Sequence, residues 1–144
     1  MKALWQAAVI LALSAIAALA VHAWHPRAPA LHLVQEPLRD DEVSIPMIQE
    51  RFGGAVLWID ARPQELYDAG HIPGALLLNE QAFDDQILSL LETLQRNDKP
   101  VVIYCSGQKC EASRKIMEKL RELSLVQHAF VLKGGWTAWE SREQ

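Results

Sequence analysis

Short apolar runs alternate with segments of helical periodicity from residue 55 almost to the end of the chain. In two of these segments, 83–94 and 112–123, apolar residues recur at helical spacing. Four other runs have the length and composition of strands that are buried on both faces: 55–60, 75–78, 101–104 and 129–132. Strands that alternate with helices favour parallel pairing through right-handed crossovers. The sequence therefore predicts an α/β fold, an open parallel sheet with helices on both faces.

The residues before this alternation indicate a linker and a first helix. Ser44 and Pro46 are typical of a helix start, and the glycines at 53 and 54 are typical of a helix end. Three prolines and the solvated charge cluster at 39–42 predict a linker, with a short edge strand at 31–34. The expected parts are an N-terminal segment over 1–24, a linker over 25–43 and a domain over 44–144.

Residues 3–24 carry no charge. An uncharged run of this length is typical of a helix that crosses a membrane, so we expect one transmembrane anchor before the domain. Lys2 and the amino terminus favour the cytoplasm for the N-terminal side, which puts the domain on the extracytoplasmic or periplasmic side. The alternative is a signal segment that is cleaved near Ala23, with secretion of the domain.

The composition argues against two kinds of partner. The chain is mildly acidic, with 14 basic residues, 18 acidic residues and a net charge of −4. It has no basic stripe, so nucleic acid is not an expected partner. His22 and His25 have no further ligand-type residues nearby, and we expect neither a metal site nor a cofactor.

Cys105 is the strongest candidate for chemistry. Ligands of an open parallel sheet bind outside the carboxyl ends of its strands, and Asp60 and Cys105 stand at two such ends. From Cys105 the chain enters a short loop that contains Gly107 and then a helix. The backbone N–H groups of such a loop and the helix dipole favour a thiolate and lower the pKa of a cysteine. The alternative from this context alone is a buried, inert cysteine.

Residues 56–140 resemble the rhodanese family along nearly their whole length. The resemblance lies in four motifs: IDAR at 59–62, ELYDAGHIPGA at 65–75, VIYC at 102–105 and LKGGW at 132–136. It implies a parallel sheet of about five strands and a sulfurtransferase whose Cys105 cycles between thiol and persulfide. The implied partners are a small donor of sulfane sulfur, such as thiosulfate or a persulfide, and a thiol or cyanide-like acceptor. A sulfur-relay protein is the alternative partner.

The resemblance also implies roles for the residues around Cys105. The active-site and anion-binding loop would consist of Ser106, Gly107, Gln108, Lys109, Cys110 and Glu111. The residues expected to support this loop structurally are Asp60, Arg62, Glu65, His71, Gly74, Gly135 and Trp136. Among them, Asp60 and Arg62 would hold neighbouring loops through hydrogen bonds, with Glu65 as a partner of Arg62. His71 would fix a turn, and Trp136 would pack beneath the loop.

The loop itself departs from the family pattern. Many members carry Arg five residues after the cysteine and Ser or Thr next, whereas this chain has Cys110 and Glu111. The glycine also comes one position earlier, and Lys109 supplies the only basic side chain. Because Glu111 should repel a dianion, we expect weak thiosulfate activity and a persulfide or a protein as the donor. Glu111 also argues against a phosphatase, whose loop needs an Arg that grips phosphate.

Two alternative functions remain open. In an oxidising compartment Cys105 and Cys110 could form a disulfide, and the chain would then be a thiol–disulfide redox protein. Cys110 could also be a resolving thiol for a persulfide, or a small residue packed at the helix start. The altered loop is compatible, in addition, with a non-catalytic rhodanese-like module for binding or sensing.

Overall fold

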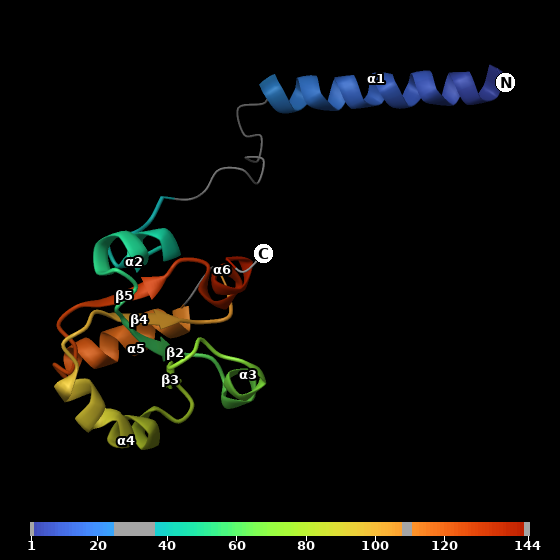
Figure 1. Cartoon of the computed structure of the whole chain (residues 1–144). Helices are drawn as coiled ribbons and strands as arrows, with labels where there is room; N and C mark the ends of the chain where they lie inside the picture. Colours follow the sequence, from blue (N-terminus) through green and yellow to red (C-terminus); the bar gives the residue numbers. More distant parts are fainter. Residues whose placement is uncertain (1, 25–36, 108–110, 143–144) are drawn as a thin grey trace. The chain divides into compact units, whose positions relative to one another are not determined.

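A computed structural model of the chain describes residues 2–24, 37–107 and 111–142. The chain divides into two compact units, Met1–Pro37 and Leu38–Gln144. The first unit holds helix α1 (Lys2–Trp24), and the second holds the sheet and the remaining helices (Figure 1). Those helices are α2 (Ile45–Phe52), α3 (Gln64–Ala69), α4 (Phe83–Arg96), α5 (Glu111–Glu122) and α6 (Gly135–Ser141).

Helix α1 covers the segment that the sequence predicts to cross a membrane. Within the residues that the structure describes, no helix combines the length and the apolar character that a membrane span needs. The predicted transmembrane anchor over 3–24 is therefore wrong. The prediction rested on the length of the uncharged run and on its apolar residues over 7–21, which by themselves do not establish a membrane span. The domain bounds, the cleaved signal segment and the cellular location stay predictions.

The second unit is built on a parallel sheet. Five strands form it in the order β1-β5-β4-β2-β3, and every neighbouring pair is parallel. Their bounds are β1 (Glu42–Val43), β2 (Leu57–Asp60), β3 (Leu76–Leu77), β4 (Val101–Tyr104) and β5 (Ala129–Leu132). This confirms the predicted α/β fold and places β4 at the centre of the sheet.

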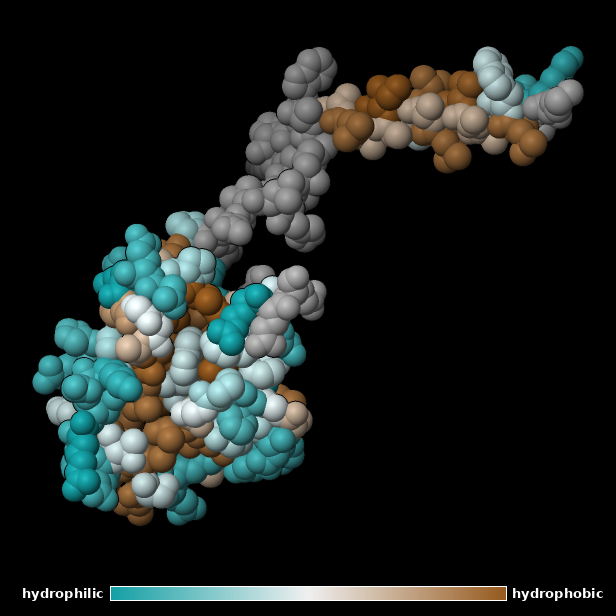
Figure 2. Space-filling model, in the orientation of Figure 1, coloured by the Kyte–Doolittle hydropathy of each residue, from teal (hydrophilic) through white to brown (hydrophobic). Residues whose placement is uncertain are grey.

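Alternate residues of β4 face the two helical layers that cover the sheet. Val101 and Ile103 pack in an apolar cluster with residues of α4 and α5. Val102 and Tyr104 pack in a second cluster with residues of α2 and α6. The two pairs of helices lie on opposite sides of the sheet (Figure 1), and hydrophilic residues dominate the outline of this unit (Figure 2). A strand buried on both faces needs apolar residues throughout, which explains the continuous apolar run at 101–104.

Helix α2 begins and ends where its sequence predicts. The side chain of Ser44 accepts a hydrogen bond from the backbone N–H of Met47 at 3.4 Å, as an N-cap does. Gly53 ends the helix with φ 59°, a left-handed conformation that favours glycine. The first helix of the domain is thus defined by its two local signals.

Strand β1 corrects the prediction that Glu42 is solvated. The sequence predicts Glu42 in a solvated cluster of charges, but Glu42 lies in β1 and is only 6% exposed. Its carboxylate accepts a 2.8 Å hydrogen bond from Arg114 and lies 3.4 Å from the ammonium of Lys133. These two cations compensate a buried carboxylate, and neither is close to it in sequence. The edge strand expected at 31–34 lies outside the described residues.

Candidate active site

Cys105 directly follows the central strand. Its side chain is 7% exposed and belongs to the apolar cluster that Ile116 and Met117 of α5 help to form. The register of the sheet aligns Asp60 with Tyr104, so the end of β2 lies beside the residue before Cys105. Asp60 and Cys105 thus both stand at the carboxyl edge of the sheet, as their positions at the ends of two strands predict.

The sulfur of Cys105 is oxidised in this structure, where it is part of a disulfide. The sequence has two cysteines, and the other is Cys110. Cys110 lies outside the described residues, as do the predicted loop residues Gln108 and Lys109. The Sγ atom of Cys105 lies 3.3 Å from the carbonyl oxygen of Gly107, a distance at which the reduced thiol can donate a hydrogen bond.

The first turn of α6 (Gly135–Ser141) holds the start of the cysteine loop. The backbone N–H of Trp136 donates a 2.7 Å hydrogen bond to the carbonyl of Cys105. The hydroxyl of Thr137 donates to the carbonyl of Ser106 at 3.2 Å. Gly135 has φ 53°, and a Cβ atom there would collide with the carbonyl oxygen of Cys105. The absent side chain of Gly135 is thus what lets this turn approach the loop.

Asp60 and Arg62 form a buried ion pair behind the loop, with side chains that are 0% and 4% exposed. Arg62 Nη2 lies 2.7 Å from the Asp60 carboxylate and donates a second bond, of 2.6 Å, to the carbonyl of Gly70. The guanidinium also stacks on the ring of Trp136, 4.3 Å from its centroid. Burial alone would lower the pKa of Arg62, but hydrogen bonding and the charge of Asp60 outweigh it and raise that pKa.

This geometry corrects the expected partner of Arg62. The sequence suggests Glu65, but Glu65 is exposed on α3, and the guanidinium is instead bound by Asp60 and Gly70. Asp60 ends β2 and points back over the following turn, where it also accepts from the backbone N–H of Arg62 at 2.9 Å. Asp60, two residues before Arg62, therefore binds the guanidinium, and Glu65 in the first turn of α3 does not.

The segment around His71 forms a fixed turn next to this pair. The His71 ring stacks on Tyr67 with their centroids 3.8 Å apart, and its Nδ1 lies 3.0 Å from the carbonyl of Tyr67. The Tyr67 hydroxyl donates to the carbonyl of Ala75 at 2.8 Å, across a turn where Gly74 has φ 79°. These contacts are those that a turn-fixing role for His71 requires.

Tyr104, the last residue of the central strand β4, is hydrogen-bonded to the turn that follows His71. Its buried hydroxyl accepts a 3.1 Å hydrogen bond from the backbone N–H of Ile72. Burial raises the pKa of the Tyr104 phenol well above its ordinary value, and hydrogen bonding with Asp60 raises it further. Tyr104 therefore stays neutral and serves as an internal acceptor. The sequence marked it only as part of a strand.

The first turn of α5 carries the last predicted loop residue. Glu111 is exposed there, and Lys115 one turn later forms a 3.0 Å ion pair with Glu80, which follows β3. Ser113, in contrast, is fully buried. Ser113 and Thr137 are not among the site residues that the sequence predicts, although the spacing of Ser113 from Ile116 places it on the apolar face of the helix.

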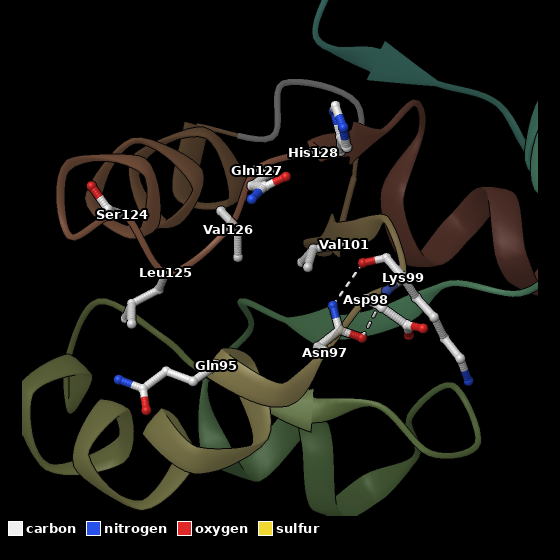
Figure 3. A pocket seen from close by; sticks show the side chains of 10 residues that line it. All are labelled: Gln95, Asn97, Asp98, Lys99, Val101, Ser124, Leu125, Val126, Gln127 and His128. Carbon is white, nitrogen blue, oxygen red and sulfur yellow. Dashed lines mark hydrogen bonds between the residues drawn. The ribbon is translucent and has the colours of Figure 1, made fainter.

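A cavity of about 440 Å³ lies at the opposite edge of the sheet, where the amino ends of β4 and β5 lie. It is lined by residues that precede β4 and β5, including Lys99 and His128 (Figure 3). The side chain of Asn97 in its wall is already bound to the backbone of Lys99. None of the predicted site residues that the structure describes lines this cavity, so the candidate active site remains the carboxyl edge around Cys105.

The arrangement matches a known family. Residues 47–142 match the model of the rhodanese-like domain. The chain belongs to the rhodanese-like domain family. That family includes sulfurtransferases and non-catalytic members, so membership gives the domain and the position of its cysteine loop without deciding the activity.

Two curated relatives contain a similar segment. The HTH-type transcriptional regulator Rv0324 of Mycobacterium tuberculosis is 36% identical over 64 residues, which cover 44% of this chain and 26% of the regulator. The tRNA uridine(34) hydroxylase of Buchnera aphidicola is 33% identical over 58 residues, which cover 39% of this chain and 19% of the hydroxylase. This chain thus spans about a quarter or less of either relative.

A solved structure supports the fold. The rhodanese-like domain protein of Staphylococcus aureus superposes with a TM-score of 0.52 at 24% identity, covering 69% of this chain and 90% of that one. At this identity the likeness concerns the fold alone.

Proposed function

We propose that this rhodanese-like domain is a sulfurtransferase and that Cys105 carries the transferred sulfur as a persulfide. The observation that supports this most directly is the position of Cys105 at the end of the central strand, in a loop that leads to the N-terminus of α5. Backbone N–H groups and the positive end of a helix favour a sulfur anion at such a position. The bond from Trp136 to the Cys105 carbonyl keeps the loop in place.

The reaction has two balanced steps. The Cys105 thiolate attacks the outer sulfur of the donor, forming a sulfur–sulfur bond while the donor's own bond to that sulfur breaks. With thiosulfate, the products are the Cys105 persulfide anion and sulfite. A thiolate acceptor then attacks the outer sulfur, becomes a persulfide itself and returns Cys105 as a thiolate; cyanide would leave as thiocyanate.

The charges at the mouth favour a persulfide or a protein donor over thiosulfate. Glu111 is exposed at the start of α5, where its charge faces an incoming dianion. The next basic residues of this helix already have acidic partners: Arg114 is paired with Asp41 and Glu42, and Lys115 with Glu80. The reacting end of a persulfide carries one negative charge where thiosulfate carries two, so it meets less repulsion at the same place.

A cyanide-coupled assay tests this function. The reduced full-length protein is mixed with glutathione persulfide or thiosulfate and with cyanide, and thiocyanate is followed. Glutathione persulfide should give the faster turnover, and Cys105→Ser should abolish it. Turnover that persists in Cys105→Ser would exclude Cys105 as the carrier.

One observation favours a second candidate, a thiol–disulfide redox function. Cys105 is part of a disulfide in this structure. Measuring the reduction potential of the Cys105 disulfide, together with dithiol–disulfide exchange on a model substrate, separates the candidates. A redox protein would need both Cys105 and Cys110 for turnover, whereas sulfur transfer to cyanide would survive Cys110→Ser.

A further inference from the structure

Ser113 carries a hydroxyl without a partner inside the domain. Ser113 is 0% exposed. In the described part of the chain, its Oγ is the only buried side-chain nitrogen or oxygen atom that makes no hydrogen bond. Buried polar groups are nearly always paired because an unpaired one loses its bond to water and gains nothing in return. The exception therefore needs a physical reason.

The position of Ser113 relates it to Cys105. Ser113, Ile116, Met117 and Leu120 form the buried face of α5. Ile116 and Met117 belong to the same apolar cluster as Cys105. Ser113 lies one turn closer to the start of the helix, which is the end that adjoins the cysteine loop. The unpaired hydroxyl is thus at the edge of the sheet where the sulfur lies.

The oxidation state of Cys105 supplies the reason. A disulfide sulfur has no charge and accepts hydrogen bonds weakly, whereas a thiolate or a persulfide is an anion that accepts them well. The structure holds Cys105 in its disulfide state. A donor needed only by the sulfur anion would be left unpaired in that state.

We propose that Ser113 is a further catalytic residue, whose hydroxyl is unpaired in the disulfide state and donates a hydrogen bond to the Cys105 thiolate or persulfide after reduction. The persulfide part of this inference rests on the proposed sulfurtransferase function, while the thiolate part does not. In the reduced domain Ser113 stabilises the charged sulfur and so increases the fraction of reactive thiolate.

Other charged and titratable groups near this edge also affect the pKa of Cys105, but they are the same in the wild-type protein and in Ser113→Ala. They come from β2, its following turn, β4, the segment after β3, α5 and the segment after β5: Asp60, Arg62, Tyr104, Glu80, Glu111, Lys115, Lys133 and Arg114, whose guanidinium contacts Asp41 and Glu42. Asp60 pairs with Arg62, Glu80 pairs with Lys115, and Lys133 contacts Glu42. Ser113→Ala changes none of these groups, nor Lys109, so a change in thiol titration reports the hydroxyl.

The test is the pH dependence of alkylation in the reduced full-length protein. Iodoacetamide labelling of Cys105 is followed by peptide mass spectrometry, which separates it from Cys110. Ser113→Ala should raise the pH midpoint of Cys105 labelling by about 0.5–1 unit, a threefold to tenfold loss of thiolate at lower pH. Ser113→Thr, which keeps a hydroxyl, should restore part of the shift. Ser89→Ala is the control, because Ser89 is exposed on α4 and bonds only to its own helix.

Thermal unfolding gives an independent readout. In the oxidised protein Ser113→Ala should leave Tm unchanged or higher, because it removes a hydroxyl that has no partner. In the reduced protein at a pH above the labelling midpoint, the same substitution should lower Tm. An unchanged midpoint, or the same change of Tm in both oxidation states, would overturn the proposal. Because labelling needs no sulfur donor, this result stands even if the wild-type protein takes up no sulfur.

Discussion

The backbone N–H of Trp136 donates a 2.7 Å hydrogen bond to the carbonyl oxygen of Cys105. This bond joins the first turn of α6 to the loop after the central strand, two segments far apart in sequence. Trp136 also stacks against Tyr104 and under the guanidinium of Arg62. The backbone of Cys105 is thus fixed by the turn that the Gly-Gly-Trp motif builds.

Gly135→Ala should separate this turn from the loop. The added Cβ would collide with the Cys105 carbonyl, so the loop must shift, and we expect sulfur transfer to fall by about 10- to 100-fold. The measurement is kcat/KM in the cyanide-coupled assay. Gly53→Ala is the matched control, since Gly53 has a similar positive φ of 59° but open space around it. Equal activity losses in both variants would refute the contact as the cause.

Arg62→Met should strongly destabilise the domain. It leaves the fully buried Asp60 carboxylate without its cation, and breaking a buried pair typically costs about 3–5 kcal/mol. Urea unfolding of the variant measures this loss. Arg96→Met is the comparison, because the Arg96–Glu92 pair is exposed and should change the free energy of unfolding by less than about 0.5 kcal/mol. A similar small loss at Arg62 would show that the pair does not support the fold.

Tyr104→Phe should change how stability depends on pH. The phenol pKa is raised in the folded domain, while an unfolded tyrosine ionises near pH 10, so the unfolded state binds fewer protons above that pH. The free energy of unfolding contributed by Tyr104 is therefore complete below about pH 10 and is lost as pH rises further.

The phenylalanine variant should lack this alkaline loss. It should also be less stable at neutral pH by about 1–3 kcal/mol, because the Ile72 N–H loses its acceptor. Urea unfolding at pH 7 and pH 11 measures both effects, with Tyr67→Phe as a control that keeps Tyr104. If Tyr104→Phe and the wild-type protein lose stability equally between these pH values, the buried phenol is not the source.

Glu111→Gln should improve the use of thiosulfate. Removing the exposed charge at the start of α5 reduces repulsion of the dianion, and we expect kcat/KM for thiosulfate to rise about two- to fivefold at low salt. The effect should shrink at high ionic strength and be smaller for glutathione persulfide. Glu118→Gln, which alters an exposed acid later on the same helix, is the control. The same gain with Glu118→Gln would point to net charge alone.

The strands and the cysteine loop could be predicted because their signals are local. A strand such as β4, buried on both faces, shows a continuous apolar run, and the position of Cys105 after it follows from the chain order. Strand β1 could not be predicted, since it has two residues and its Glu42 is compensated by Arg114 and Lys133 from distant elements. Such pairing depends on the tertiary structure and leaves no periodic pattern in the sequence.

The other differences have similar causes. The sequence offers two carboxylates for Arg62, and only the direction in which Asp60 leaves its strand decides between them. Helical spacing placed Leu123 on the apolar side of α5, but the helix ends at Glu122 and Leu123 is 54% exposed. For α1, the absence of charge was not sufficient evidence of a membrane span.

Intact mass spectrometry of the reduced full-length protein tests the central claim most directly. The wild-type protein and Cys105→Ser are exposed to glutathione persulfide or thiosulfate, then to cyanide. The account predicts a gain of one sulfur atom that needs Cys105, is larger with the persulfide and disappears with cyanide. No gain with either donor, in protein that is folded and reduced, would contradict sulfur transfer at Cys105.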